Sequence, residues 1–477
     1  MQSASFRPQA PTFSLLTHLA GDSEQLALYS ERSCVESWLA AERALALAQA
    51  EHGVLTRAEA RSIVGAARYD NVDLNTLWEV ARNVGYPVHG LVREVGRSLD
   101  PHTAGRMHFG ATTQDIMDTG LVLQLVRSLS ALDGALGRLG DAVMRKAVEH
   151  AHTVMPARTH AQQAVPTTFG TTLATLLAQL TRHRERLTQA LPRIGVVELF
   201  GAGGTAAAFG PKSGAIRASF ARILGLRDAT VAWHVERDGI AEFGWLCATI
   251  TATCAKLARN IVDLSRAEIG EVFEPYADHR GASSTMPQKV NPISSEILIG
   301  LSGAAGALLS SLPRIQEAGH ERAAGEWQIE WQVVPQLAVL AGSALNEALV
   351  IVDGMRVDAG RMRANLDQDS GLVMAEAQMM HIAGVLGHNQ AHDMVHEAAT
   401  RARSRRITLA AGLREVASEW GHLDVLPDPL VEPEDYLGEA VVAIRQATDR
   451  WAATEAADKT HVPIARLAVE ADGSEIQ

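Results

Sequence analysis

Long stretches without proline constrain this chain more than any other feature of its sequence. The 17 prolines leave windows of 54 residues (102–155), 63 residues (212–274) and 91 residues (336–426) with none. Proline inside a helix costs about 3 kcal/mol, and proteins of short β-strands need turn residues about every 8–12 positions. Long windows rich in alanine and leucine therefore predict an all-α protein built on long helices.

Apolar residues at helical spacing predict which segments form these helices. The first would be on the order of 50 Å long. Segments 121–125 and 173–180 are apolar on more than one side of the helix, which predicts neighbours on several sides and hence an oligomer. The five predicted long helices cover residues 116–150, 167–191, 240–269, 291–309 and 326–352.

Shorter helices flank the predicted bundle. The pattern [ST]-x-x-E at 33–36 and at 56–59 is typical of capping boxes, and Asp73 can cap a helix that ends before Pro87. Shorter helices return near residue 355, and the chain ends in a polar tail at 470–477. At about 150 residues per domain the length suggests three domains. They are an N-terminal helical domain (1–110), a central long-helix bundle (111–354) and a C-terminal helical domain (355–477).

Composition and charge exclude several classes of protein. A hydrophobic fraction of 47% excludes a disordered chain, and a net charge of −12 with no basic run argues against nucleic acid or an anionic membrane as partners. No uninterrupted apolar run reaches the ~18 residues of a membrane span. Residues 1–11 are polar and lack the apolar core of a signal peptide, so we expect a cytoplasmic protein with no membrane partner.

Cysteines and histidines give no metal-ligand pattern, so we expect neither a metal ion nor another cofactor. Cys34, Cys247 and Cys254 are an odd, sparse set, typical of free thiols in a reducing compartment. Histidines 388, 392 and 396 recur at i, i+4 and i+8, which we interpret as a surface stripe of a helix.

The glycine-rich segment 201–210 has two interpretations. Gly201-x-Gly203-x-x-Ala206 formally matches a dinucleotide fingerprint, which would indicate a nucleotide-dependent oxidoreductase. That fold needs a β-strand before the glycines and an acidic residue about 20 positions later, whereas here a long helix precedes them and Asp228 comes late. We therefore favour a glycine-rich link between two long helices.

The segment GASSTMPQKVNP (281–292) carries the sharpest chemical signal. Its two prolines and small polar residues predict a loop before the next helix. Lys289 and Asn291, two apart on an extended chain, point the same way and can clamp one carboxylate. Ser283 could serve as a nucleophile or a base, but the G-x-S-x-G elbow of many hydrolases is absent.

This segment resembles the signature S-S-x-M-P-x-K-x-N of the fumarase/aspartase superfamily, which it matches at six positions. Two further segments, HFGATTQDIMDTG (108–120) and ARTHAQQAVPTTFG (157–170), resemble other blocks of that superfamily in their expected order, so that the resemblance covers roughly residues 30–450. The six matching residues are Ser283, Ser284, Met286, Pro287, Lys289 and Asn291.

The resemblance implies a fold, an assembly and a mechanism. It implies a homotetramer with a 20-helix core, in which three subunits share each active site. Such enzymes remove a proton next to a carboxylate and then expel a group from the adjacent carbon of a small dicarboxylate. Ser283 would be the base, Lys289 would stabilise the aci-carboxylate, and His160 would orient the substrate or protonate the leaving group. The implied substrate-binding residues are Thr112, Thr113, Asn291, Thr159, Gln162, Met286 and Arg322.

Details within the superfamily favour the branch of the 3-carboxy-cis,cis-muconate cycloisomerases. HFGATTQD resembles their H-W-G-A-T-S-Q-D, and ERAAGEWQIEW (321–331) resembles their R-x-x-G-x-W-x-x-E-W. Trp233 stands where adenylosuccinate lyases usually carry a substrate-binding glutamine. However, His160 replaces a typical tryptophan of the cycloisomerases, and Lys289-Val290-Asn291 replaces their K-R-N.

We therefore expect a carbon–nitrogen lyase that releases fumarate or a related unsaturated acid from a substituted succinate, as a nitrosuccinate lyase does. The first alternative is the lactone-forming cycloisomerase. An adenylosuccinate lyase-type enzyme and a non-catalytic, crystallin-like protein are weaker alternatives.

Overall fold

The computed structural model describes residues 19–458, so the predictions for segments 1–11 and 470–477 lie outside the described residues. Helices dominate this part of the chain. Its strands form two two-stranded sheets, β1 (Val154–Thr159) with β2 (Gln162–Thr168) and β3 (Val272–Phe273) with β4 (Arg356–Val357). The predicted all-α class is confirmed.

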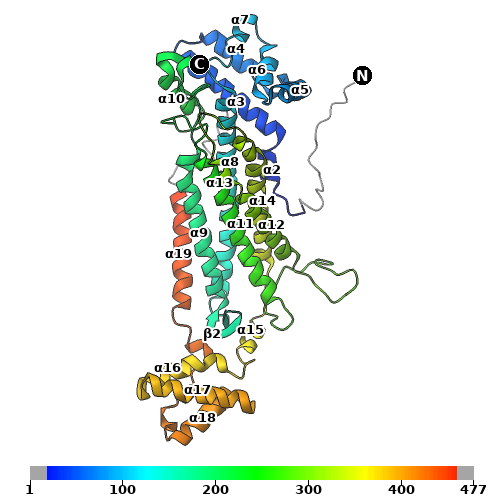
Figure 1. Cartoon of the computed structure of the whole chain (residues 1–477). Coiled ribbons are helices and arrows are strands. Elements are labelled where there is room, and N and C mark those ends of the chain that lie inside the picture. The colour runs from blue at the N-terminus through cyan, green and yellow to red at the C-terminus, as the bar shows by residue number, and fades with distance from the viewer. Residues whose placement is uncertain (1–18, 459–477) are drawn as a thin grey trace.

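Five long helices run lengthwise beside one another and form the body of the molecule (Figure 1). The first has 37 residues, which corresponds to about 55 Å of helix. The predicted long helices are therefore confirmed, with ends that differ by a few residues. They are α8 (Thr113–Glu149), α9 (Phe169–Ile194), α11 (Asp238–Leu264), α12 (Ile293–Leu309) and α14 (Glu326–Gly354).

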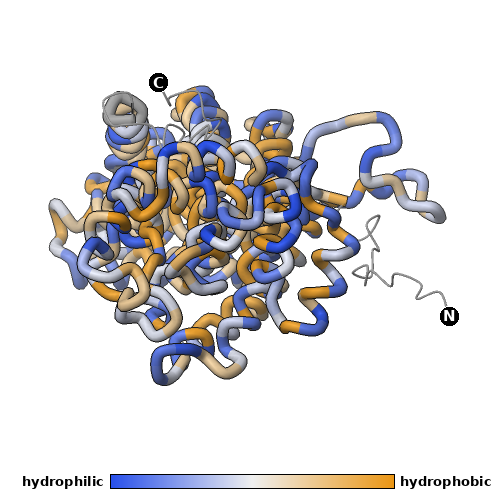
Figure 2. The backbone as a smooth tube through the Cα atoms, turned by 90° about the horizontal axis from the view of Figure 1, so that it is seen from above, coloured by the Kyte–Doolittle hydropathy of each residue, from blue (hydrophilic) through white to orange (hydrophobic). Residues whose placement is uncertain are grey.

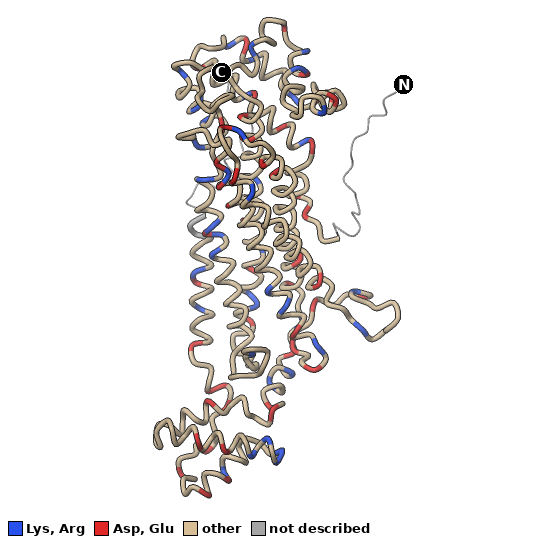
Figure 3. The backbone as a smooth tube through the Cα atoms, in the orientation of Figure 1, with Lys and Arg blue, Asp and Glu red and all other residues tan. Residues whose placement is uncertain are grey.

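Leucine, isoleucine and alanine fill the space between these helices. Leu129, Leu177, Phe243 and Ala341 are all fully buried in one core cluster that includes residues of each long helix. Figure 2 shows the backbone from above, coloured by hydropathy, and Figure 3 shows long uncharged stretches along the central helices. Small and aliphatic side chains let helices pack closely, which explains a large core with few aromatic residues.

Short helices cover the end of the bundle where α8 begins. The capping box of Thr56 and Glu59 is confirmed, and Asp73 caps its helix through the Asn75 amide. The first predicted box is wrong by three residues, because Ser30 rather than Ser33 accepts the capping hydrogen bond. These elements are α2 (Ser23–Leu28), α3 (Glu31–Glu51), α4 (Arg57–Ala66), η1 (Tyr69–Asn71), α5 (Leu74–Val84), α6 (Val88–Gly96) and α7 (Pro101–Ala104).

Further short elements connect the long helices and form a small helical region at the opposite end of the bundle (Figure 1). The connecting elements are η2 (Ala207–Lys212), α10 (Ser213–Ile223) and α13 (Leu312–Ile315). The elements of the far end are α15 (Ala359–Asn365), η3 (Leu372–Met374), α16 (Ala375–Leu386), α17 (His388–Arg405), α18 (Leu409–Trp420), η4 (Leu423–Val425) and η5 (Pro433–Asp435).

The last helix, α19 (Ala440–Asp458), returns from this far end and packs along α9 (Figure 1). Its residues Ile444 and Trp451 belong to the core of the bundle. The division of the chain at about 110 and 355 stays a prediction, and α19 adds to the bundle although it follows the second of these positions.

By length and composition alone, two helical stretches could cross a membrane, Ile293–Ile315 and Glu326–Gly354. Neither stretch contains an uninterrupted apolar run of ~18 residues, so the sequence criterion did not predict them. Glu326–Gly354 is a core helix, because 56% of its apolar window is buried in the chain. In Ile293–Ile315 the buried share is 22%, so α12 has an apolar face that the described residues leave uncovered.

Candidate active site

At the start of α8, a buried carboxylate holds three segments together. Asp115 accepts hydrogen bonds from the backbone amides of Thr112 (2.9 Å), Phe200 (3.1 Å) and Gly201 (2.9 Å). His234 Nε2 lies 2.9 Å from the same carboxylate and can donate to it. Asp115 is fully buried, so these contacts fix the turn before α8 relative to the 200–201 loop and the 233–237 segment.

Arg322 lies at the same end of the bundle as Thr112 and Thr113. Its guanidinium donates to Gln114 Oε1 (2.8 Å) and to the Ala202 carbonyl (2.9 Å). Thr113 is the first residue of α8 and is half-buried. The structure therefore brings three predicted substrate-binding residues to one end of the bundle.

The glycine-rich segment lies at the same end of the bundle. It does not follow a strand of a nucleotide-binding sheet. It links α9 to η2, and Val196 before it makes only an isolated bridge to Arg227. Gly201 has a φ of 72°, a left-handed conformation that glycine adopts without strain. The segment is a link between helices, but it joins the long helix α9 to η2 and the short helix α10 rather than to a second long helix. Its backbone contacts Asp115 and Arg322.

A buried ion-pair network lies beneath this end. Arg237 donates to both oxygens of Asp118 (2.8 and 3.0 Å) and to both oxygens of Glu330 (2.7 and 2.5 Å). Burial lowers the pKa of Arg237, but the Asp118 and Glu330 carboxylates outweigh it and raise that pKa above its ordinary value. Trp327 Nε1 donates to Asp118 Oδ1 at 3.1 Å. Such a network gives the overlying turn a rigid base.

Sequence reasoning missed one buried group of potential ligands. Asp115, Glu198 and His234 each offer an atom within 4.8 Å of the others, and all three are buried. Burial raises the pKa of Glu198 to about 9, and the charges of Asp118 and Asp115 add to the effect. Because Asp115 already accepts four hydrogen bonds, the geometry fits a hydrogen-bonded cluster better than a metal centre. These residues are far apart in the sequence, so spacing gave no signal.

The loop of Ser283 projects sideways from the bundle between β3 and α12 (Figures 1 and 2). Ser283 Oγ accepts hydrogen bonds from the amides of Thr285 (3.3 Å) and Met286 (3.1 Å). Two amide donors on one hydroxyl oxygen stabilise negative charge there. Met286 is 43% exposed on the same loop.

Lys289 and Asn291 are placed differently from each other. Asn291 donates through its backbone amide (2.8 Å) and its side chain (3.0 Å) to the Gly281 carbonyl, which closes the base of the loop. Lys289 is exposed, and its ammonium makes no hydrogen bond or ion pair within residues 19–458. In the single chain, Lys289 is therefore free to meet a substrate, whereas the Asn291 side chain holds the loop.

His160 lies at the tip of the β1–β2 hairpin. His160 and Ala161 have positive φ values of 51° and 61°, as the central residues of a tight type I′ hairpin turn require. Thr159 and Gln162 pair across the hairpin beside them, and all four residues are exposed. The turn therefore presents the His160 imidazole at the surface of the chain.

A buried ion pair anchors this hairpin. Arg158 donates to both oxygens of the buried Glu271 (2.9 and 2.5 Å), and Asn365 donates to the same carboxylate (2.6 Å). Gln163 donates to the Asn365 carbonyl at 2.9 Å. Sequence reasoning missed these positioning contacts, which join segments that are about a hundred or more residues apart.

The predicted site residues do not all meet within one chain. Thr113 begins α8 and His160 follows its far end, so about 55 Å of helix separates them. No hydrogen bond or ion pair among residues 19–458 joins the turn before α8, the hairpin tip and the Ser283 loop. Within one chain, the turn before α8 and the hairpin tip therefore cannot contact the same small substrate.

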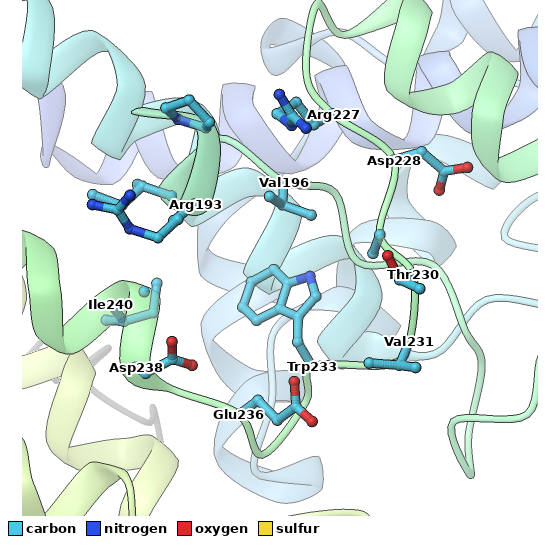
Figure 4. A pocket seen from close by; sticks show the side chains of 14 residues that line it. Arg193, Val196, Arg227, Asp228, Thr230, Val231, Trp233, Glu236, Asp238 and Ile240 are labelled. Carbon is cyan, nitrogen blue, oxygen red and sulfur yellow. The ribbon is translucent and has the colours of Figure 1, made fainter. Parts of the chain in front are cut away.

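A cavity of about 350 Å³ lies between the end of α9 and the start of α11 (Figure 4). Trp233 forms its floor, and Arg193, Arg227, Asp228 and Glu236 surround it. None of the predicted catalytic or substrate-binding residues lines this cavity. It is therefore not the site that the sequence motifs predict.

Comparison with known proteins gives the family. A sequence model of a lyase family matches residues 21–305. The chain is 39% identical over 426 residues to a 3-carboxy-cis,cis-muconate cycloisomerase of Pseudomonas aeruginosa, which covers 88% of this chain and 93% of that protein. It is 35% identical over 438 residues to a nitrosuccinate lyase of Streptomyces davaonensis, covering 89% and 92%.

The fold agrees with a solved relative. The structure of a 3-carboxy-cis,cis-muconate lactonizing enzyme from Pseudomonas putida superposes with a TM-score of 0.86 at 36% identity, covering 93% of this chain and 100% of that one. Sequence and fold thus give the same assignment, and the chain belongs to this lyase family, within the fumarase/aspartase superfamily.

Proposed function

We propose that this enzyme removes a leaving group from a substituted succinate by β-elimination and releases fumarate or a related unsaturated acid. The base takes the proton from the carbon next to one carboxylate, and the resulting carbanion is delocalised into that carboxylate. The electron pair then forms the carbon–carbon double bond as the substituent leaves the adjacent carbon. A nitrogen-linked substituent would make the enzyme a carbon–nitrogen lyase.

Ser283 fits the role of the base. Its Oγ already accepts two amide hydrogen bonds, which favours the alkoxide. Lys289, on the same loop, would add positive charge, and its ammonium is also a cation available to the aci-carboxylate. Closure of the projecting loop over the substrate would exclude water and strengthen both effects.

The turn before α8 fits the second substrate carboxylate. The first amides of a long helix have no intrahelical acceptor, and the helix dipole favours an anion there. Thr112 and Thr113 add hydroxyl groups, and Arg322 supplies a cation at the same end of the bundle. Met286, Thr159 and Gln162 would line the site from the loop and the hairpin.

The exposed His160 imidazole is the observation that favours elimination over cyclisation. The left-handed turn presents an exposed imidazole, which can protonate a leaving group or orient the substrate. A tryptophan at this place, as in typical cycloisomerases, could donate a hydrogen bond but could not protonate a leaving group. Nitrite would need little help from an acid, whereas an amine would depend on it.

A homotetramer would bring the three motifs together. The length of α8 separates them in one chain, and α12 has an apolar face for a partner helix. Gly300, Gly303 and Gly306 on α12 have open space where a side chain would start, which allows close approach of another backbone. No metal ion or other cofactor enters this chemistry.

The second candidate is lactone formation from 3-carboxy-cis,cis-muconate. The 39% identity to a cycloisomerase favours it. The same carboxylate-stabilised carbanion would serve that reaction, with an internal carboxylate as the entering group. Purine-type and non-catalytic roles lack a comparable supporting observation.

A substrate panel tests the function. Succinates that carry amino, nitro or N-linked substituents should produce fumarate absorbance, and Ser283→Ala should abolish it. Consumption of carboxymuconate absorbance without fumarate release would replace the proposal with the cycloisomerase. Turnover that survives Ser283→Ala would remove Ser283 as the base.

Mixed oligomers test the shared site. His160→Ala and Ser283→Ala proteins should each be inactive. After unfolding and refolding together in equal amounts, about a quarter of the sites should combine an intact His160 with an intact Ser283 from different chains. No recovery of activity from soluble mixed oligomers would refute sites built across subunits.

A further inference from the structure

The contacts around Asp115 indicate which ring nitrogen of His234 carries a proton. Its Nε2 lies 2.9 Å from Asp115 Oδ1 and 3.5 Å from Glu198 Oε1, whereas its Nδ1 is buried with no partner among the described residues. A proton on Nδ1 would be buried without an acceptor, which is costly. The geometry therefore favours a proton on Nε2, where it faces both carboxyl groups.

Glu198 occupies the second position around this imidazole. One of its oxygens accepts the Trp233 amide at 2.8 Å, and the other has no closer partner than His234. The charged groups that face it are Asp115 and Asp118 on α8 and Arg237 after the 233–236 segment. Arg237 is already neutralised by Asp118 and Glu330, so a second anion beside Asp115 would have no counter-ion of its own.

We propose that Glu198 and His234 are positioning residues that hold the Thr112–Thr113 turn in the shape that binds a substrate carboxylate. This inference rests on the proposed function, because it takes that turn as the carboxylate site. While Glu198 keeps its proton, His234 donates to Asp115, and Asp115 holds the Thr112 and Gly201 amides. Ionised Glu198 competes for the same imidazole N–H and repels Asp115, so the turn and the 200–201 loop loosen.

Binding of fumarate across pH tests this coupling. In the wild-type protein the dissociation constant of fumarate, measured by calorimetry, should be constant from pH 7 to near 9 and should then rise about tenfold per pH unit. Glu198→Gln cannot ionise, so its dissociation constant should stay flat to pH 10. Glu94→Gln, a change at another buried glutamate in the N-terminal helices, should behave like the wild type. An equal alkaline rise in Glu198→Gln would overturn the proposal.

Amide hydrogen exchange separates this inference from the proposed function, because it needs no ligand. Pulsed exchange of peptides covering 108–116 and 196–203, corrected for the intrinsic rate, should show protection that the wild type loses above about pH 9 and Glu198→Gln keeps. His234→Ala should lose this protection at every pH. Equal protection in wild type and Glu198→Gln across the range would overturn the network. Absence of fumarate binding with the expected exchange pattern would refute only the role of the turn in binding carboxylates.

Discussion

The contact between Gly140 and Trp451 predicts that Gly140→Ala has opposite effects on stability with and without the Trp451 side chain. Trp451 of α19 is fully buried and packs against Gly140 of α8. A Cβ added at Gly140 would lie 2.0 Å from a carbon of the indole ring, far inside van der Waals contact. Trp451 Nε1 also donates to Asp141 Oδ1 at 2.8 Å. These contacts fasten the last helix to the bundle.

The expected magnitudes follow from this geometry. Trp451→Ala should lower the free energy of unfolding by about 3–5 kcal/mol, as truncation of a buried aromatic residue does. Gly140→Ala gains about 1 kcal/mol of helix propensity but overpacks the site, which costs about 1–3 kcal/mol. In the Trp451→Ala protein the overlap is gone. Gly140→Ala should therefore destabilise the wild type and stabilise the Trp451→Ala variant.

A double-mutant cycle measures this reversal. The midpoint of chemical denaturation is followed by circular dichroism at one fixed protein concentration, since assembly would shift the apparent stability. Gly134→Ala is the matched control on α8, because only the end of Arg138 lies within 4 Å of the added carbon. It should have the same effect in both backgrounds. If Gly140→Ala has the same sign with and without Trp451, the steric reasoning is refuted.

Three further predictions concern buried charges and a helix cap. Burial lowers the pKa of His108, but the charge and hydrogen bond of Glu42, 2.6 Å away, together with the charge of Asp115, outweigh it and raise that pKa. The stabilisation from protonated His108 is complete below pH ~6.5 and is lost as pH rises through its folded pKa. The melting temperature of Glu42→Gln should therefore fall furthest below wild type in acid, and a difference independent of pH would contradict this. Arg237→Met leaves two buried carboxylates without a cation and should cost about 3–5 kcal/mol in denaturation midpoints, and a neutral effect would show that the network is dispensable. Thr56→Ala removes a capping box and should cost about 0.5–2 kcal/mol, whereas Thr56→Ser should restore most of it.

Much of the fold is local and could be predicted. The long helices follow mainly from apolar periodicity, which acts within a few turns of the same segment. Of the five, α8 and α11 also lie wholly in the long windows without proline, whereas α9 and α14 contain Pro192 and Pro335. The cap at Thr56 was predicted because its signal is local too. Helix α3 shows the limit, since Ser30 and Ser33 are both suitable caps and only the path of the preceding chain selects Ser30. The return of α19 onto α9 depends on contacts such as Trp451 with Gly140, which no local pattern contains.

The candidate site divides in the same way. Ser283, Lys289 and His160 lie in contiguous motifs, so their identity could be read directly. Glu198 and His234 could not be found, because each gains its role from partners that are distant in the sequence. Asn291 as a substrate-binding residue stays a prediction, and in the single chain its side-chain amide donates to the Gly281 carbonyl.

The sequence by itself determined the helical class, the positions of the long helices and the residue types of the predicted site motifs. These follow from forces that act over a few residues or from signatures written in contiguous letters. Only the tertiary structure decided that α8 separates the motifs by its full length, that one buried carboxylate joins the Thr112 turn to the glycine-rich loop, and that the last helix packs on the bundle. Burial, charge pairing and van der Waals contact act between segments that the folded chain alone brings together.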